Sequence, residues 1–352
     1  MIFLRDPKNG ASVSLATKHQ IEFLSREERD RRAEADADFK FDWSNVQPGF
    51  DREERSHPAP VHFSWCDRPL ERGHNGRKIY TFLIISENED LSSPEVYTTD
   101  KSSLDVYNLK NGTRYYWCVQ KNGRRSKTYS FCTEFIVPRF IRIDGVSNVR
   151  DMGGYVVEGG KRIRQGIIYR GSEFENKMHI SEKGINDLLG LKIRTDLDLR
   201  GESKSQVENF ITPLFNMNRI FLPSEAYDGL FLPEEKRELN RFFTTFANPK
   251  NYPIYYHCRG GADRTGSYSF ILGALYGMSL DDLFLEYELT SLSIWGTRVR
   301  NHKLFKKFLN SFFALPGETN AEKARNFLRV NAGLSDAQID KIYEIALEDI
   351  SE

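Results

Sequence analysis

The sequence contains little cysteine and no excess of charge of either sign. Its four cysteines in 352 residues are too few for a disulfide framework. Lysine and arginine together number 50, and so do aspartate and glutamate, which argues against a nucleic-acid ligand or a strongly basic membrane-binding surface. Any preference for an anionic ligand must therefore come from a local cluster of residues.

The sequence also lacks a long apolar run. No stretch reaches the length of a transmembrane helix, and the first residues contain neither a basic segment nor a signal cleavage site. We therefore expect a soluble protein, cytoplasmic as the sequence stands and secreted or periplasmic if a signal peptide has been removed. No cluster of histidine, cysteine and carboxylate residues has metal-ligand spacing, so no metal or other cofactor is expected. The length suffices for two domains with separate cores.

Residues 1–136 are predicted to form an all-β sandwich that includes an N-terminal charged helical segment. Short runs of alternating apolar residues, such as 61–66 and 128–133, are separated by turn residues, as in sandwiches. Residues 12–15 are a candidate edge strand. Residues 17–38 carry charges of both signs, which favours a solvated helix with i,i+4 ion pairs over a nucleic-acid arm.

One segment of this half, Leu109-Lys-Asn-Gly-Thr-Arg-Tyr115, resembles part of a fibronectin type III module. The resemblance implies that Tyr115 closes a tyrosine corner and that Trp65 fills the core. The role of the domain stays open between a structural one and the binding of a protein or glycan ligand.

Three cysteines lie in the same half. Strand alternation places the side chains of Cys66 and Cys118 on outward faces if their apolar neighbours point inward. A disulfide between the two sheets is therefore not expected, and we predict that Cys66, Cys118 and Cys132 are free thiols.

Residues 137–352 are predicted to form an α/β domain with a mainly parallel central sheet covered by helices. Strands are expected at 167–170, 192–200, 219–222 and 253–256. Helices are expected from Ser181 to Leu189, over 234–247, from Ser279 to Tyr287, over 303–313, and from the capping box Ser335–Gln338 to about Asp349. Ligands of such sheets bind beyond the carboxyl ends of the strands. Arg170, Asp198, Arg200 and Cys258 all fall there.

The segment from His257 to Gly266 joins a buried strand to an apolar helix. It reads His-Cys-Arg-Gly-Gly-Ala-Asp-Arg-Thr-Gly, with five residues between Cys258 and Arg264. Backbone N–H groups in a tight loop at a helix N-terminus form a cradle for an anion. The same cradle stabilises a thiolate, so Cys258 is expected to be nucleophilic. Arg264 can donate two hydrogen bonds to phosphate oxygens.

The other loop residues suit the same purpose. Gly260 and Gly261 permit a positive φ and a close approach of the backbone. Thr265 places a hydroxyl near the sulfur, and His257 can brace the loop by hydrogen bonding. The remaining candidate substrate-binding positions are Arg259, Ala262, Gly266, Arg170 and Arg200. An inert cysteine beside a helix cap would not require this combination.

The loop resembles the signature loop of the cysteine-dependent protein tyrosine phosphatases, in particular their atypical bacterial tyrosine and dual-specificity branch. Further motifs that resemble the branch are Asn148-Val-Arg-Asp-Met-Gly-Gly-Tyr155, Tyr169-Arg-Gly-Ser172, Asp198-Leu-Arg-Gly-Glu202, Glu286-Tyr-Glu-Leu-Thr-Ser291 and Gly333-Leu-Ser335. The resemblance implies phosphoryl transfer in two steps. The Cys258 thiolate attacks phosphorus, and water then hydrolyses the cysteinyl-phosphate.

Three carboxylates compete for the role of general acid toward the leaving group. Asp263 lies inside the loop and Asp198 ends a neighbouring strand, and the resemblance implies a functional aspartate at both positions. Asp228 lies about where dual-specificity enzymes carry a mobile acid loop. Each could instead have a structural role, as a cap, an arginine partner or a surface turn.

The substrate also stays open. Members of the branch that hydrolyse phosphoinositides often carry a lysine where this sequence has Ala262, which favours phosphotyrosine or another phosphomonoester over a lipid. Inositol polyphosphates would need basic residues, which Arg150, Arg170, Arg200 and Arg259 could supply. A further alternative is a phosphate-binding pseudoenzyme whose sandwich mediates binding. An arsenate reductase is disfavoured because this half contains no second thiol.

Overall fold

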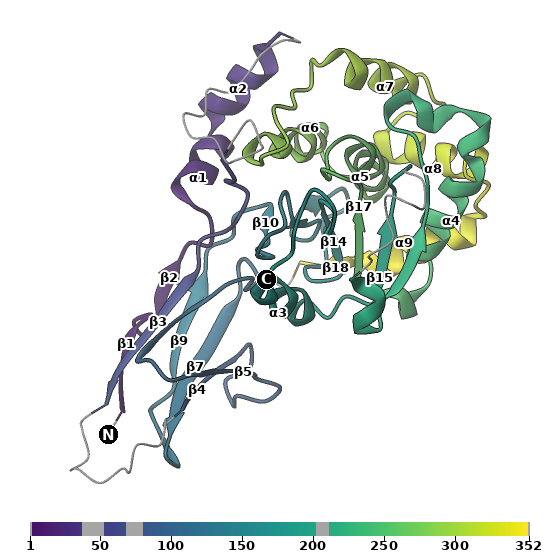
Figure 1. Ribbon diagram of the computed structural model, residues 1–352. Coiled ribbons are helices and arrows are strands. Elements are labelled where there is room, and N and C mark those ends of the chain that lie inside the picture. Colours follow the sequence, from purple (N-terminus) through teal and green to yellow (C-terminus); the bar gives the residue numbers. More distant parts are fainter. Residues whose placement is uncertain (1, 37–52, 68–79, 202–210, 351–352) are drawn as a thin grey trace. The chain divides into compact units, whose positions relative to one another are not determined.

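The computed structural model describes residues 2–36, 53–67, 80–201 and 211–350 (Figure 1). The end of the charged segment at 37–38 and Glu202 of the Asp198–Glu202 motif lie outside these residues. The chain divides into two compact units, and each contains two separate stretches of sequence. The first unit comprises 1–17 and 58–137, and the second comprises 18–57 and 138–352. The charged helical segment, which the sequence grouped with the sandwich, thus belongs to the second unit.

Two sheets build the first unit. One contains β1 (Ile2–Asp6), β3 (Val61–Asp67) and β6 (Ser103–Val106). The other contains β2 (Ala11–Val13), β9 (Tyr129–Thr133), β7 (Arg114–Lys121), β4 (Thr81–Ser86) and β5 (Glu95–Thr99), with β8 (Arg124–Arg125) paired to β7. Phe63 of the first sheet packs edge-on against Trp117 and Phe131 of the second. The two sheets therefore enclose one apolar core, and β2 is an edge strand.

Two residues of this unit occupy the positions that the fibronectin resemblance implied. The hydroxyl oxygen of Tyr115 accepts a hydrogen bond of 2.9 Å from the backbone N–H of Lys110, five residues upstream. This is the contact that a tyrosine corner makes. Trp65 is buried in the shared core. The likeness to a fibronectin module itself stays a prediction.

All four cysteines are free, as predicted for the three in this unit. The outward placement of Cys118 was wrong in one respect, because its side chain is buried. Arg125 of β8 donates a hydrogen bond of 3.0 Å from Nε to the Cys118 sulfur. Strand alternation shows which face a side chain occupies but cannot show that a long side chain from a neighbouring strand lies over this face.

A six-stranded sheet forms the centre of the second unit. Its order is β10 (Arg139–Phe140), β11 (Arg150–Asp151), β14 (Ile168–Gly171), β17 (Ile254–His257), β15 (Thr195–Asp198) and β16 (Asn218–Phe221). The last four of these strands are parallel, and β10 and β11 are antiparallel additions at one edge. The predicted parallel sheet is thus confirmed for the strands that lead into the candidate site.

Helices cover both faces of this sheet, as Figure 1 shows. Tyr255 belongs to an apolar cluster with Leu188 of α3 (Glu182–Gly190). The next residue, Tyr256, points to the opposite face, where its hydroxyl bonds Ser269 of α5 (Asp263–Tyr276) at 2.7 Å. Further helices of this unit are α4 (Lys236–Phe246), α6 (Leu280–Glu288), α7 (Lys303–Phe313), α8 (Asn320–Val330) and α9 (Asp336–Ala346).

The structure adds elements that the sequence patterns did not predict. One is α8, which begins with a capping box between Thr319 and Glu322. Another is a small sheet of β12 (Val156–Val157), β13 (Lys161–Ile163) and β18 (Leu347–Asp349). The predicted last helix therefore ends at Ala346, because the chain then pairs with β13. Within the described residues, the helices are too short or too polar to cross a bilayer.

The charged segment forms α1 (Lys18–Leu24) and α2 (Arg26–Glu34). The prediction of a solvated face is wrong for Arg32. Its side chain is fully buried, forms an ion pair of 2.9 Å with the equally buried Glu288, and lies over the Phe23 ring. A charged residue can be buried where a partner distant in sequence neutralises it, and sequence periodicity does not reveal such a partner.

Candidate active site

The carboxyl ends of three parallel strands converge on the loop that begins at Cys258. Gly171 ends β14 and Asp198 ends β15, and both lie in register with His257 at the end of β17. The loop continues directly into α5 at Asp263. The loop thus lies at the carboxyl ends of the parallel strands, which is the edge of the sheet where a ligand site was expected.

The carbonyl groups of the loop point away from its centre, each toward a donor outside. They accept from Leu199 N (His257 O, 2.8 Å), His257 Nδ1 (Cys258 O, 3.0 Å), Glu173 N (Arg259 O, 3.1 Å) and Asn148 Nδ2 (Gly260 O, 2.9 Å; Gly261 O, 3.1 Å). In a planar trans peptide the N–H points opposite to the C=O. The N–H groups that follow these carbonyls therefore face the inside of the loop, at the N-terminus of α5. This arrangement can bind an anion.

The two loop glycines are required by close contacts. A Cβ on Gly260 would lie 2.7 Å from the indole of Trp295. A Cβ on Gly261 would lie 2.3 Å from the carbonyl oxygen of Gly171, and Gly261 also has a φ of +63°. No other residue fits at Gly261 without moving the backbone.

The candidate nucleophile and the candidate phosphate ligand differ in exposure. Cys258 is only 5% exposed and lies at the base of the loop. Arg264 is half-buried in the first turn of α5, and its guanidinium runs close to Gly201. Thr265 is buried beneath it, whereas Arg259 is exposed. Ala262 and Gly266 are buried, and Gly266 packs near Tyr287.

His257 braces the loop through both ring nitrogens. Nδ1 donates to the Cys258 carbonyl, and Nε2 lies 3.1 Å from a carboxylate oxygen of Asp196. Burial alone would lower the pKa of His257, but the charges of Asp196 and Asp198 outweigh it and raise the pKa to about 9. The residue is therefore an imidazolium at neutral pH. The sequence patterns missed Asp196, although it lies in the same predicted strand as Asp198.

Arg170 supports the loop from within the protein. It is fully buried and donates to the Gly261 carbonyl and, at 2.7 Å, to the Ser269 hydroxyl. It also forms an ion pair of 3.1 Å with Glu286. Burial, together with the nearby charge of Arg150, lowers its pKa to about 10. The structure thus places Arg170 behind the cradle, away from the space that a substrate would enter.

Asp198 and Arg200 form a buried ion-pair network. Arg200 donates to Asp198 at 2.8 Å, to Glu173 at 2.9 Å and to Glu175 at 2.8 Å. Asp198 is fully buried and also accepts from Arg219. Burial raises the pKa of Asp198, but the charges and hydrogen bonds of its cationic neighbours prevail and hold the pKa far below its ordinary value. Neither residue faces solvent.

Asp263 is held by two residues that the sequence analysis missed. Arg298 donates to its two carboxylate oxygens at 2.8 and 2.9 Å, and the Tyr227 hydroxyl donates to one of them. Burial would raise the pKa of Asp263, but Arg298 and the Tyr227 hydrogen bond lower it below the ordinary range. The side chain is nevertheless 39% exposed. A bidentate arginine was not detectable in sequence, because Arg298 lies 35 residues away.

The loop at 224–229 carries Asp228 beside a constrained tyrosine. Tyr227 has a φ of +57°, and its N–H donates to the Ser267 hydroxyl of α5 at 2.9 Å. Asp228 points toward α7, where it forms an ion pair of 2.5 Å with Lys307. The anchoring of Tyr227 fixes this loop to the helix that begins at the cradle.

Two residues not predicted from sequence lie beside the loop. Trp295 packs against Gly260, as the glycine contacts show, and is partly exposed. The ammonium of Lys177, an exposed residue, lies 5.6 Å from the centre of the Trp295 ring. With the exposed Arg259, the surroundings of the loop present cationic and aromatic groups to solvent.

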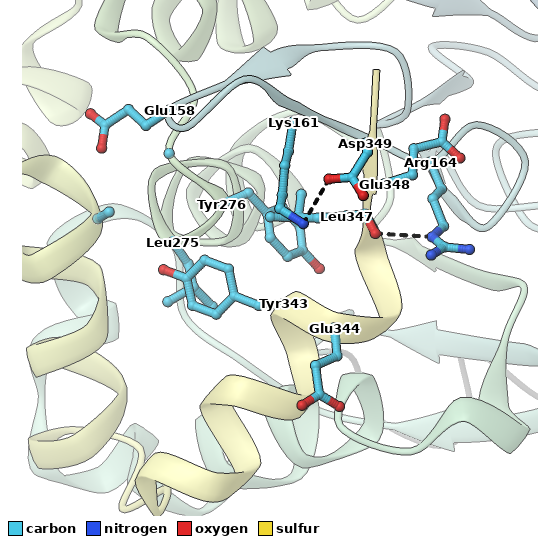
Figure 2. A pocket seen from close by; sticks show the side chains of 12 residues that line it. Glu158, Lys161, Arg164, Leu275, Tyr276, Tyr343, Glu344, Leu347, Glu348 and Asp349 are labelled. Atoms are coloured by element: carbon cyan, nitrogen blue, oxygen red, sulfur yellow. Dashed lines mark hydrogen bonds and ion pairs between the residues drawn. The ribbon is translucent and has the colours of Figure 1, made fainter. Parts of the chain in front are cut away.

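A cavity of about 650 Å³ lies apart from this loop (Figure 2). Leu275, Tyr276 and Gly277 at the far end of α5 line it, together with Tyr343 and residues of the small sheet. Figure 2 shows the ion pair of Lys161 with Asp349 and the hydrogen bond of Arg164 to the Leu347 carbonyl at its edge. Since α5 has 14 residues, about 20 Å separate this cavity from the cradle.

Comparison with known proteins finds a family that matches a large part of the second unit. Residues 141–348, more than half of the chain, match the family described as the tyrosine phosphatase family. The chain is 28% identical over 172 residues to a Cupriavidus necator protein named as a tyrosine-protein phosphatase. This match covers 42% of the chain and 61% of that protein, which is less than two thirds of the relative's length.

Two solved structures of the Siw14 catalytic core show a weaker likeness. One is the core catalytic domain of the PP-IP phosphatase Siw14 from Saccharomyces cerevisiae in complex with citrate. It is 21% identical, covers 48% of this chain and 87% of its own, and has a TM-score of 0.32. The other structure is also 21% identical. It covers 50% of this chain and 85% of its own, with a TM-score of 0.30. On the extent of the match over residues 141–348, the chain belongs to the tyrosine phosphatase family.

Proposed function

We propose that the protein hydrolyses phosphomonoesters through a cysteinyl-phosphate intermediate, with phosphotyrosine or another aryl phosphate as substrate. The observation that carries the proposal is the outward orientation of the loop carbonyls from His257 to Gly261. This orientation directs the N–H groups around Cys258 toward a bound phosphate. Membership in the tyrosine phosphatase family supports the same chemistry.

In the first step, the Cys258 sulfur attacks phosphorus and the bond from phosphorus to the ester oxygen breaks. The loop N–H groups and Arg264 hold the other three oxygens, on which charge is spread in the transition state. In the second step, water attacks the cysteinyl-phosphate, the sulfur leaves as thiolate, and inorganic phosphate is released. His257 does not react but keeps the loop in place through the Cys258 carbonyl.

The state of the candidate acids supports an aryl leaving group. Asp263 is paired with Arg298, Asp198 with Arg200 and Arg219, and Asp228 with Lys307. For Asp263 and Asp198, these contacts hold the pKa below its ordinary value and so favour the carboxylate over the acid. A phenoxide needs less help from a proton than the more basic alkoxide of serine. We therefore assign Asp198 to anchoring Arg200, and we expect phosphotyrosine to be preferred over phosphoserine.

Asp263 has a different role from Asp198 in this proposal because its side chain is partly exposed. Its neighbour Arg264 binds the phosphate, and the Arg298 pair fixes the carboxylate beside it. We propose that Asp263 orients water in the second step as a carboxylate, which needs no proton at the start of the cycle.

A second candidate substrate is an inositol polyphosphate. The exposed side chains of Arg259, within the loop, and of Lys177, near Trp295, could contact additional phosphates. The same cradle and the same nucleophile would serve both substrates.

One experiment tests the proposal and separates these substrates. Wild type and Cys258→Ser are assayed for phosphate release from phosphotyrosine peptides, phosphoserine peptides, phosphoinositides and inositol phosphates. We expect turnover of phosphotyrosine peptides that Cys258→Ser abolishes. Activity that survives in Cys258→Ser would overturn the mechanism, and preference for inositol phosphates would overturn the substrate. Binding of inorganic phosphate without turnover of any substrate would identify a pseudoenzyme.

A further inference from the structure

Residues 53–57 contact the turn that supports the phosphate loop. They belong to the second unit but lie far outside the region 141–348 that matches the family. The Ser56 hydroxyl accepts a hydrogen bond of 2.9 Å from the backbone N–H of Asn148. It donates to the Glu54 carboxylate, which also accepts from the Ser147 hydroxyl.

Asn148 connects this contact to the loop. Its side-chain nitrogen donates to the carbonyls of Gly260 and Gly261 at 2.9 and 3.1 Å, which orients two of the peptides that form the cradle. Its side-chain oxygen accepts from Arg150 at 2.6 Å. Asn148 thus needs a fixed position, and its φ of +59° lies in the left-handed region, which asparagine tolerates better than most residues with a side chain.

We propose that Ser56 and Glu54 are positioning residues of the active site, which act through Asn148 on the phosphate loop. Ser56, Ser147 and Asn148 are at most 2% exposed, so water cannot replace the Ser56 hydroxyl. Without it, the buried N–H of Asn148 has no partner, and the left-handed conformation of Asn148 loses the hydrogen bond that fixes it. The family's catalytic region is therefore completed here by a segment that precedes it by more than 80 residues.

Other contacts hold the segment in place independently of Ser56. His57 Nε2 lies 2.8 Å from the Val146 carbonyl oxygen, and the Arg55 N–H donates to the Leu292 carbonyl at 2.8 Å. The Gln20 amide donates to the carbonyls of Arg55 and His57 at 3.0 and 2.9 Å. Removal of the Ser56 hydroxyl should therefore loosen Asn148 without detaching the segment.

The test is a double-mutant cycle in the full chain with Ser56→Ala, Asn148→Ala and the double variant. The control is Thr245→Ala, which removes a buried hydroxyl whose hydrogen bond, among the residues that the structure describes, goes to the Arg241 carbonyl within α4 of the same unit. Three quantities are measured: kcat and KM on an aryl phosphate, the dissociation constant of orthovanadate as a phosphate analogue, and the unfolding temperature.

We expect Ser56→Ala to lower kcat roughly tenfold and to weaken orthovanadate binding, because a displaced loop loses alignment with the transition state. In the Asn148→Ala background, the same substitution should change neither quantity further. Thr245→Ala should retain the wild-type kcat. The proposal would be overturned if the fold-changes in kcat of the two single variants multiplied in the double variant. An unchanged kcat in Ser56→Ala would also overturn it.

The inference rests on the proposed phosphatase activity, but the binding measurement separates the two. If the wild type binds orthovanadate without turnover, the proposed function fails. The coupling of Ser56 to Asn148 is then decided by the dissociation constants of the four proteins in the cycle, which must show the same non-additivity.

Discussion

Arg298 holds Asp263 through two hydrogen bonds of 2.8 and 2.9 Å, directly beside Arg264 in the first turn of α5. The pair keeps Asp263 ionised, since its pKa lies below the ordinary value although the side chain is partly buried. An arginine from a separate turn thus constrains Asp263, the residue for which we propose a role in the second step. The consequence is a specific dependence of activity on pH.

Arg298→Ala should shift the acidic limb of the pH–rate profile upward. Without the guanidinium, the main influence that lowers the pKa of Asp263 is lost, so the pKa rises and the carboxylate protonates at a higher pH. We expect the variant to lose more activity at pH 5 than at pH 7, relative to wild type. Arg325→Ala, which removes a surface ion pair with Asp336 and Asp340, is the control and should leave the limb unchanged. An unshifted limb in Arg298→Ala would show that Asp263 is not the group that titrates.

Gly261→Ala should abolish activity, because the added Cβ would meet the Gly171 carbonyl at 2.3 Å. The loop must then move, and a misplaced cradle costs about 100-fold in rate or more. Gly10→Ala is a matched control, since Gly10 has a similar φ of +76° but no atom within 4 Å of the added Cβ. Initial rates and unfolding temperatures of the two variants separate the loop contact from backbone strain. Comparable rates in both variants would contradict the required close approach.

The sequence predicted the parallel strands and the position of Cys258, because strand periodicity and the glycine-rich loop are local patterns. It did not predict Arg298, Tyr227 or Ser56, which reach the site from distant parts of the chain. It also placed Arg170 and Arg200 among the substrate ligands, whereas both are fully buried and paired with carboxylates of the protein. A position at the end of a strand can be read from sequence, but the direction in which a long side chain extends depends on its tertiary partners.

The ion pair of His257 with Asp196 should make stability depend on pH in the alkaline range. The folded-state pKa of His257 is raised from 6.5 to about 9, so its stabilising contribution is complete below pH 6.5 and is lost as pH rises through 9. The difference corresponds to at most about 3 kcal/mol. Urea unfolding of wild type and Asp196→Asn between pH 6 and 10 measures this loss. We expect a weaker pH dependence in Asp196→Asn, and an equal dependence would assign it to other groups.

Arg32→Ala should destabilise the second unit, because it leaves part of the Glu288 carboxylate buried without its partner. Breaking a buried pair from one side typically costs about 3 kcal/mol or more, although Arg300 still contacts Glu288 at 2.8 Å and will limit the loss. Arg26→Ala is the control on the same helix, because Arg26 is almost fully exposed. Thermal unfolding followed by circular dichroism compares the two. Equal unfolding temperatures would mean that α2 contributes little to the fold of this unit.

The pairing of Asp263 and Asp198 with arginines predicts a strong dependence of rate on the leaving group. With little proton donation, kcat/KM for phenyl phosphate should fall well below that for 4-nitrophenyl phosphate, whose phenoxide is the less basic. Asp228→Asn should keep this ratio, because Asp228 is engaged with Lys307 and not with the cradle. Asp263→Asn should lower kcat for both substrates toward one common value and leave kcat/KM nearly unchanged, since the proposed role concerns hydrolysis of the intermediate that both substrates form. A variant that slows only phenyl phosphate would identify its aspartate as the general acid, because only an acid acts in proportion to the basicity of the leaving oxygen.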